Sequence, residues 1–178
     1  MPARVAHRRG MSVSPIVNVN EVPETGSVEG HFGAFDKILT PSMRERGGKL
    51  GVVRVRVPPR TVACPFHHHT LEDEVFFVLS GAGTLRYGED VLPLREGDCV
   101  SCPAGTGIAH QVANTSETED LVYLAIGPHE PHEVCGYPDS GKVMVRSLRT
   151  VGVLERTGYM HGEPEVPRVL QLGAERRG

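Results

Sequence analysis

Apolar and polar residues alternate most clearly in the middle of the chain. From Leu50 onward, the run Val53-Arg54-Val55-Arg56-Val57 has a period of two, and Pro58-Pro59 ends it. Successive side chains of a strand point to opposite faces, so this run predicts a half-buried strand. With the valines in a core, both arginines face solvent or an interface. In the inverted register they line a pocket and suit a carboxylate or phosphate.

Six further short apolar segments follow, separated by turn sequences that contain Gly, Pro or Asp. They are residues 74–79, 84–87, 91–94, 99–102, 110–114 and 121–126. Strands of this length at intervals of about ten residues are typical of a sandwich or barrel. No segment with a helical period stands between residues 48 and 127. The pattern therefore predicts an all-β fold.

The pattern is weaker on both sides of this region. We expect a short strand at Ile16–Val19, mixed structure over 20–47, and one more strand at Val143–Ser147. The predicted organisation is a disordered tail over residues 1–14, a single domain over 15–150 and a C-terminal extension over 151–178. Met11 is an alternative start to Met1.

Composition narrows the class of protein. The chain has 178 residues, 39% of them hydrophobic, and a net charge of -3. This length suffices to bury a core, and the charge does not favour nucleic acid, which needs a basic surface. No apolar segment has the length of a membrane span, and no secretory signal is visible. We therefore expect a cytoplasmic protein without nucleic-acid or membrane partners.

The four cysteines, Cys64, Cys99, Cys102 and Cys135, are expected to stay reduced in that compartment. Cys99 and Cys102 form a C-x-x-C, which in redox and zinc proteins lies at a turn or helix start. Here the pair lies in a predicted strand, and no second pair exists. We interpret both residues as packing residues.

The candidate chemistry lies in the segment from Pro65 to Glu74. Residues two apart in a strand share a face, so His67 and His69 point together and His68 points away. Glu74 opens the next strand, and His110 comes from a later one. Three neutral imidazoles and one carboxylate suit a first-row divalent metal with open positions for water, oxygen or substrate. We predict these four residues as metal ligands, with Glu74 also acting as a proton acceptor.

Other polar residues receive weaker assignments. Glu72 and Asp73 are expected to be solvated turn residues, either of which replaces Glu74 only if the strand register slips. The cluster His129–Glu133 is expected to be an exposed loop, with a lid or a second metal site as alternatives. The segment 139–142 contains a turn signal, and Lys142 is a candidate contact for an anionic substrate.

These residues carry a family resemblance. His67, His69, Glu74 and Gly81 match the first motif of the cupins, although Thr61 stands where that motif often has a glycine. The second motif is matched by Gly97, Pro103, Gly105, His110 and Asn114. Its loop between Gly105 and His110 has four residues where the family commonly has two. Together the motifs cover residues 61–114, and the chain resembles small single-domain cupins that carry a segment like Tyr137–Lys142.

The resemblance implies a double-stranded β-helix, a jelly-roll barrel with its metal near one mouth, and a homodimer. It implies one divalent transition metal, which can be Fe, Mn, Ni, Co, Cu or Zn. We expect a metal-dependent enzyme acting on a small oxygen-rich molecule, with dioxygenase-type oxidation favoured slightly over isomerase or lyase chemistry. Sugar-isomerase-like labels within the group rest on fold analogy. The alternatives are a non-catalytic sensor or binding module and a barrel that binds nothing.

Overall fold

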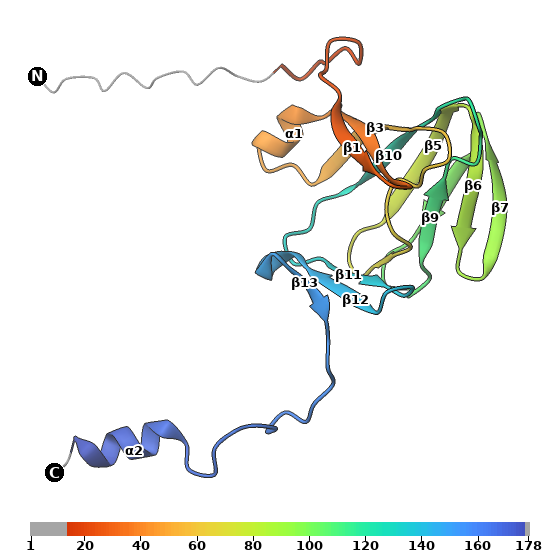
Figure 1. The fold of residues 1–178 in the computed structure, drawn as a ribbon. Coiled ribbons are helices and arrows are strands. Elements are labelled where there is room, and N and C mark those ends of the chain that lie inside the picture. The colour runs from red at the N-terminus through yellow and green to blue at the C-terminus, as the bar shows by residue number, and fades with distance from the viewer. Residues whose placement is uncertain (1–13, 177–178) are drawn as a thin grey trace, which may run out of the picture.

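The computed structural model describes residues 14–176. The predicted disorder of residues 1–13 and the alternative start at Met11 lie outside the described residues. Three antiparallel sheets, arranged in two layers, form the body of the described molecule (Figure 1). The first sheet has the order β1-β2-β3-β10-β5-β8. Its strands are β1 (Thr25–Glu29), β2 (Phe32–Ile38), β3 (Leu50–Val57), β10 (Leu121–Pro128), β5 (Glu74–Ser80) and β8 (Cys99–Cys102).

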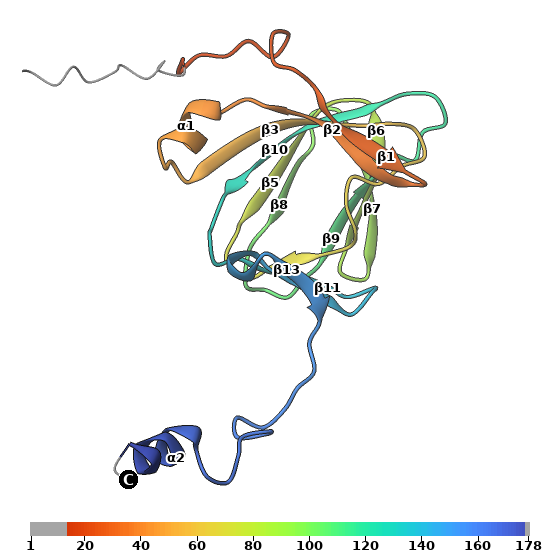
Figure 2. The ribbon, with the colours of Figure 1, turned by 60° about the vertical axis from the view of Figure 1, so that its left-hand side comes forward.

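The second layer consists of two groups of strands that meet end to end. One has the order β7-β6-β9, with β7 (Asp90–Arg95), β6 (Ala82–Tyr87) and β9 (His110–Ala113). The other has the order β13-β12-β11-β4, with β13 (Thr150–Val153), β12 (Lys142–Val145), β11 (Val134–Tyr137) and β4 (His68–His69). An isolated bridge between His67 and His110 joins the two groups. Figure 2 shows β9 and β7 facing β5 and β8 across the interior, while β11 and β13 lie across one end.

Helices are few and lie outside the barrel. They are α1 (Pro41–Glu45), a 3-10 turn (Arg146–Leu148) and α2 (Arg168–Glu175). Figures 1 and 2 show α2 at the end of an extended segment, away from the sheets. Within residues 14–176, no helix combines the length and apolarity needed to cross a membrane.

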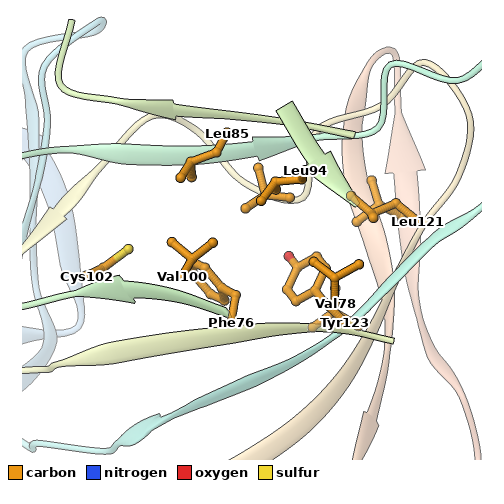
Figure 3. Packing of buried hydrophobic residues seen from close by; sticks show 11 residues of the cluster. Phe76, Val78, Leu85, Leu94, Val100, Cys102, Leu121 and Tyr123 are labelled. Carbon is orange, nitrogen blue, oxygen red and sulfur yellow. The ribbon is translucent and has the colours of Figure 1, made fainter. Parts of the chain in front are cut away.

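The core is built from alternate residues of the strands. Val55 and Val57 of β3 are buried, whereas Arg54 and Arg56 lie on the outer face and pair with Glu24 at 3.3 and 2.6 Å. The register with the valines inside is therefore confirmed. Inner residues of both layers meet in one cluster (Figure 3). It comprises Val55, Val57, Phe76, Val78, Leu85, Leu94, Val100, Cys102, Val112, Leu121 and Tyr123.

The all-β prediction is confirmed, because every element from β3 to β10 is a strand. The predicted strand at Ile16–Val19 is wrong: the segment has no strand partner, and the Ile16 side chain is 81% exposed. Residues 20–47 instead contain the β1–β2 hairpin and α1. The predicted strand Val143–Ser147 begins one residue earlier and ends in the 3-10 turn. The predicted domain boundary at residue 150 falls inside β13.

The packing role predicted for the C-x-x-C pair holds for Cys102 and is wrong for Cys99. All four are free thiols, and Cys99 is exposed while Cys102 is buried. Residues three apart in a strand point to opposite faces, so this pair does not converge on one ion.

Candidate metal centre

The four predicted ligands come together at one end of the barrel interior. His69 lies in β4, Glu74 opens β5 and His110 opens β9, while His67 bridges to His110 just before β4. One ligand atom from each residue lies within 4.8 Å of all the others. The antiparallel bridge between His67 and His110, with backbone bonds of 3.1 and 2.7 Å, brings together two histidines that are far apart in sequence.

The three imidazoles surround a single carboxylate oxygen. Glu74 Oε2 lies 2.9 Å from His110 Nε2, 3.2 Å from His69 Nε2 and 3.8 Å from His67 Nε2. Among the described residues, both ring nitrogens of His69 are buried without a hydrogen-bond partner. A buried polar atom without a partner is costly and needs an explanation. A cation bound between the imidazoles and the carboxylate would explain the buried Nε2 of His69, because that nitrogen would then be a metal ligand.

The tautomer of His67 is fixed by its surroundings. Its Nδ1 donates to the carbonyl oxygen of Pro65 at 2.9 Å, and Cys64 Sγ lies 3.6 Å from the same nitrogen. A carbonyl oxygen only accepts, so Nδ1 carries the proton and Nε2 presents its lone pair to the centre. The Phe76 ring, 5.6 Å from that of His110, separates the polar centre from the apolar core.

Burial and charge set the protonation of the cluster. Burial raises the pKa of Glu74, but its hydrogen bond with His110 and the nearby rings of His67 and His69 outweigh this and lower that pKa well below its usual range. Burial lowers the pKa of His110. Burial also lowers the pKa of His67, but contacts with Cys64 and Glu74 outweigh this and raise it to about 11. Without a cation, His67 thus carries a second proton, on Nε2, beside the Glu74 carboxylate.

This donor set fits a divalent transition metal. Three imidazole nitrogens and one carboxylate oxygen are the ligands of many Fe, Mn, Co, Ni and Zn centres, and four protein ligands leave open positions in an octahedral shell. His67, His69, Glu74 and His110 are the residues that can hold such an ion. His68 lies outside the group, because its ring packs over Gly136 of β11.

Two acidic residues were misread from the sequence. Glu72, expected to be solvated, is only 5% exposed, and Glu133, expected in an exposed loop, is 0% exposed. Their oxygens and a His69 ring nitrogen form a second close group, within 4.8 Å of one another. The predicted exposure is correct for His129 and His132 of the same loop and for Asp73. Neither outer histidine joins a metal-ligating group among the described residues.

Arg146 was missed altogether by sequence reasoning. It forms a two-pronged ion pair with Glu72, with Nη2 2.9 Å from Oε2. The pair spans 74 positions of the sequence, and no local motif signals it. The segment Tyr137–Lys142 is the turn between β11 and β12, and Lys142 pairs with Tyr137 at its base and lies over its ring.

A groove of about 590 Å³ adjoins Glu74. Its lining includes Gly51 of β3 and Gly127 of β10, which are paired across the sheet. A Cβ on Gly127 would lie 3.6 Å from Glu74 Cγ, so the missing side chain keeps space open beside the carboxylate. Arg44 and Lys49 give the groove two basic residues.

Comparisons with known proteins agree with this geometry. Residues 53–127 match the family model of the cupin domain. Auxin-binding protein 4 of Zea mays is 37% identical over 84 residues, which are 42% of this chain and 40% of that protein. An oxalate-binding protein of Thermotoga maritima is 32% identical over 73 residues, 41% of this chain and 57% of that protein. The chain thus spans about half the length of these curated relatives.

A solved structure extends the likeness beyond the motifs. The structure of a candidate sugar phosphate isomerase from Acidithiobacillus ferrooxidans superposes with a TM-score of 0.68 at 26% identity. The superposition covers 79% of this chain and 92% of that one, so it includes both layers of the barrel. The expected double-stranded β-helix is confirmed. The chain has the cupin fold, and residues 53–127 match the cupin domain.

Proposed function

We propose that the protein is a metal-dependent enzyme that acts on a small, oxygen-rich molecule. One observation carries the proposal: three imidazole Nε2 atoms converge on Glu74 Oε2, and the buried nitrogens of His69 have no hydrogen-bond partner among the described residues. Such an arrangement of donors is costly to bury unless a cation compensates it. The proposed ligands are those predicted from the sequence.

Each residue has a role in the proposed chemistry. When bound, a divalent metal supplies a Lewis acid or redox centre for substrate oxygens. His67, His69 and His110 hold it throughout. Glu74 also lines the groove, so its carboxylate can accept a proton from a substrate that enters there. The Phe76 and Tyr123 rings, 5.4 Å apart, close the apolar side and keep water from entering through the core.

The groove supports an anionic substrate. Arg44 and Lys49 line it together with Glu74, so a negatively charged group can lie at the basic residues while another oxygen reaches the metal. The names of two similar proteins fit this class, because oxalate and sugar phosphates are both oxygen-rich anions. Dioxygenase-type oxidation, isomerisation and lyase chemistry all use the four ligands. The response to O₂ separates the first from the other two.

The test compares three proteins loaded with cobalt(II): the wild type, Gly51→Val and His68→Ala. A Cβ at Gly51 meets only the Gly127 carbonyl oxygen at 3.4 Å, so valine narrows the groove and leaves the four ligands in place. We expect oxalate to change the visible spectrum of the wild type and of His68→Ala, and to act more weakly on Gly51→Val. If oxalate, sugar phosphates and O₂ all leave the wild-type spectrum unchanged, the proposal of a catalytic metal with open coordination positions is contradicted.

A second candidate function is a non-catalytic binding module. The observation in its favour is that both curated relatives are named for binding, one for auxin and one for oxalate. Under this proposal a ligand changes the metal spectrum and is recovered unaltered. Product analysis by mass spectrometry after incubation with sugar phosphates and with oxalate distinguishes the two functions.

We further propose a homodimer in the cytoplasm. The extended segment after β13 exposes large apolar residues, including Leu154 at 66% and Tyr159 at 98%, and the Val169 side chain of α2 is 72% exposed. A second copy can cover them. Light scattering coupled to gel filtration should give twice the chain mass, and the monomer mass after deletion of residues 155–178. A monomeric full-length protein contradicts this proposal.

A further inference from the structure

Two buried carboxylates face the rear nitrogen of one candidate ligand. His69 Nε2 faces Glu74, whereas His69 Nδ1 lies 3.6 Å from Glu72 Oε2 and 3.6 Å from Glu133 Oε1. We propose that Glu72 and Glu133 are positioning residues, which keep the proton on Nδ1 and leave the Nε2 lone pair free for the metal. The inference rests on the proposed metal site.

Glu133 is held in place by the backbone next to His69. Its side chain is completely buried, and its two oxygens accept hydrogen bonds from the amides of Thr70 at 2.7 Å and Leu71 at 2.9 Å. The Thr70 hydroxyl donates a third, at 3.3 Å. Because these amides directly follow His69, the same carboxylate fixes the course of the chain after β4 and faces the His69 ring.

Glu72 is fixed from the other side by Arg146. The guanidinium binds both carboxylate oxygens and also donates to the Glu130 carbonyl oxygen at 2.7 Å. The Glu130 amide in turn donates to Glu72 Oε1 at 2.6 Å. A two-pronged pair of this kind restricts the carboxylate in direction as well as in distance. Glu72 Oε2 is therefore held facing His69.

The charges around Nδ1 explain the effect. At 3.6 Å neither carboxylate forms a hydrogen bond with Nδ1, so the influence is electrostatic. Two carboxylates and one guanidinium leave a net negative charge beside this nitrogen, which favours a proton there. A carboxylate behind a ligating histidine fixes its tautomer and raises its basicity.

The same three groups do not suit a second metal ion. Both Glu133 oxygens already accept backbone hydrogen bonds, and Arg146 already supplies the cation next to Glu72. The proposal therefore predicts one metal ion per chain. It also makes the loop before β11 and the 3-10 turn after β12 part of the site.

The experiment measures cobalt(II) affinity by competition with a chromogenic chelator, together with the visible spectrum of the bound ion. In Glu72→Gln, the amide can direct its NH₂ group at His69 Nδ1, which favours the wrong tautomer. We expect about 10–100-fold weaker binding and an altered spectrum in this variant. Glu130→Gln is the matched control, since Glu130 lies in the adjacent loop before β11 and its carboxylate pairs with Lys49 at 3.7 Å.

If Glu72 has only a structural role, Glu72→Gln lowers the unfolding temperature but keeps the wild-type spectrum and cobalt affinity. That result overturns the inference. Nitrogen NMR of the zinc-loaded wild type gives a readout that needs no variant. We expect His69 to carry its proton on Nδ1, and a proton on Nε2 overturns the inference. Two metal ions per chain overturn it as well. A wild type that takes up neither metal instead contradicts the proposed function on which it rests.

Discussion

The two ends of the barrel interior differ sharply, although the same strands build both. Along the inner face of β5, Glu74 has a side chain 25% exposed, Phe76 is 6% exposed and Val78 is 1% exposed. Along β9, His110 is followed on the same face by Val112. Both strands thus lead from a charged centre to an apolar core. The alternation of side chains along the strands directs residues inward at both ends of the barrel. Whether an end can bind a metal depends on the type of residue with which each strand begins.

Removal of a candidate metal ligand has the largest expected effect, and it should change metal binding at the charged end without unfolding the apolar core. His110→Ala deletes an imidazole that lies 2.9 Å from Glu74 Oε2. Metal affinity should fall by more than the about 10–100-fold typical of residues behind a ligand. Metal analysis after gel filtration checks this, and circular dichroism should retain its β-type spectrum. Full metal content in this variant contradicts the assigned centre.

Truncation of a side chain in the apolar core should lower stability and leave metal binding unchanged. Leu121→Ala removes a side chain that is fully buried in the core, and the free energy of unfolding should fall by about 2–5 kcal/mol. Metal affinity should remain that of the wild type, because Leu121 belongs to the apolar cluster and not to the ligand group. Urea denaturation measures the loss, with the half-exposed Leu92→Ala as control. Equal losses in the two variants mean that the core is misassigned.

The pH dependence of metal binding sharpens the account of the open end. Contacts with Cys64 and Glu74 raise the pKa of His67 to about 11, so the metal-free site holds a proton that the metal must displace. Apparent affinity should therefore rise with pH, by about tenfold per unit between pH 6.5 and 8.5. The lowered pKa values of Glu74 and His110 add no further protons in this range. Chelator competition at three pH values tests this, and an affinity independent of pH contradicts it.

The smallest effect on metal affinity is expected from substitution of His68. His68 lies between two candidate ligands in sequence, but its ring packs on Gly136 instead of facing Glu74. His68→Ala should keep the wild-type metal affinity and change the unfolding free energy by no more than about 1 kcal/mol. If it loses as much metal as His67→Ala, the strand register at the site is wrong.

The candidate metal ligands were easier to predict from the sequence than the residues that surround them. The four candidate ligands lie at strand positions that the period of two and the cupin motifs identify, and the structure brings them together. Glu72, Glu133 and Arg146 were not predictable in the same way. Their contacts join residues 63 and 74 positions apart, and charged residues near prolines usually indicate solvated loops. Burial of these side chains depends on how the β11–β12 hairpin packs, which no local pattern encodes.

The termini show a related limit. Ile16–Val19 has the composition of a strand but finds no partner strand, because local apolar character does not provide a ladder of hydrogen bonds. The hairpin of β1 and β2 was missed for the opposite reason. All five residues of β1 are exposed, so its sequence lacks the alternation that marks a half-buried strand.

The central claim is that the open end of the barrel holds one catalytic metal ion. Its most direct test is the metal content of the untagged protein, purified without added metal and measured by mass spectrometry. We predict about one iron, manganese, nickel, cobalt, copper or zinc ion per chain. Absence of metal, even after incubation with each of these ions in turn, would contradict the claim.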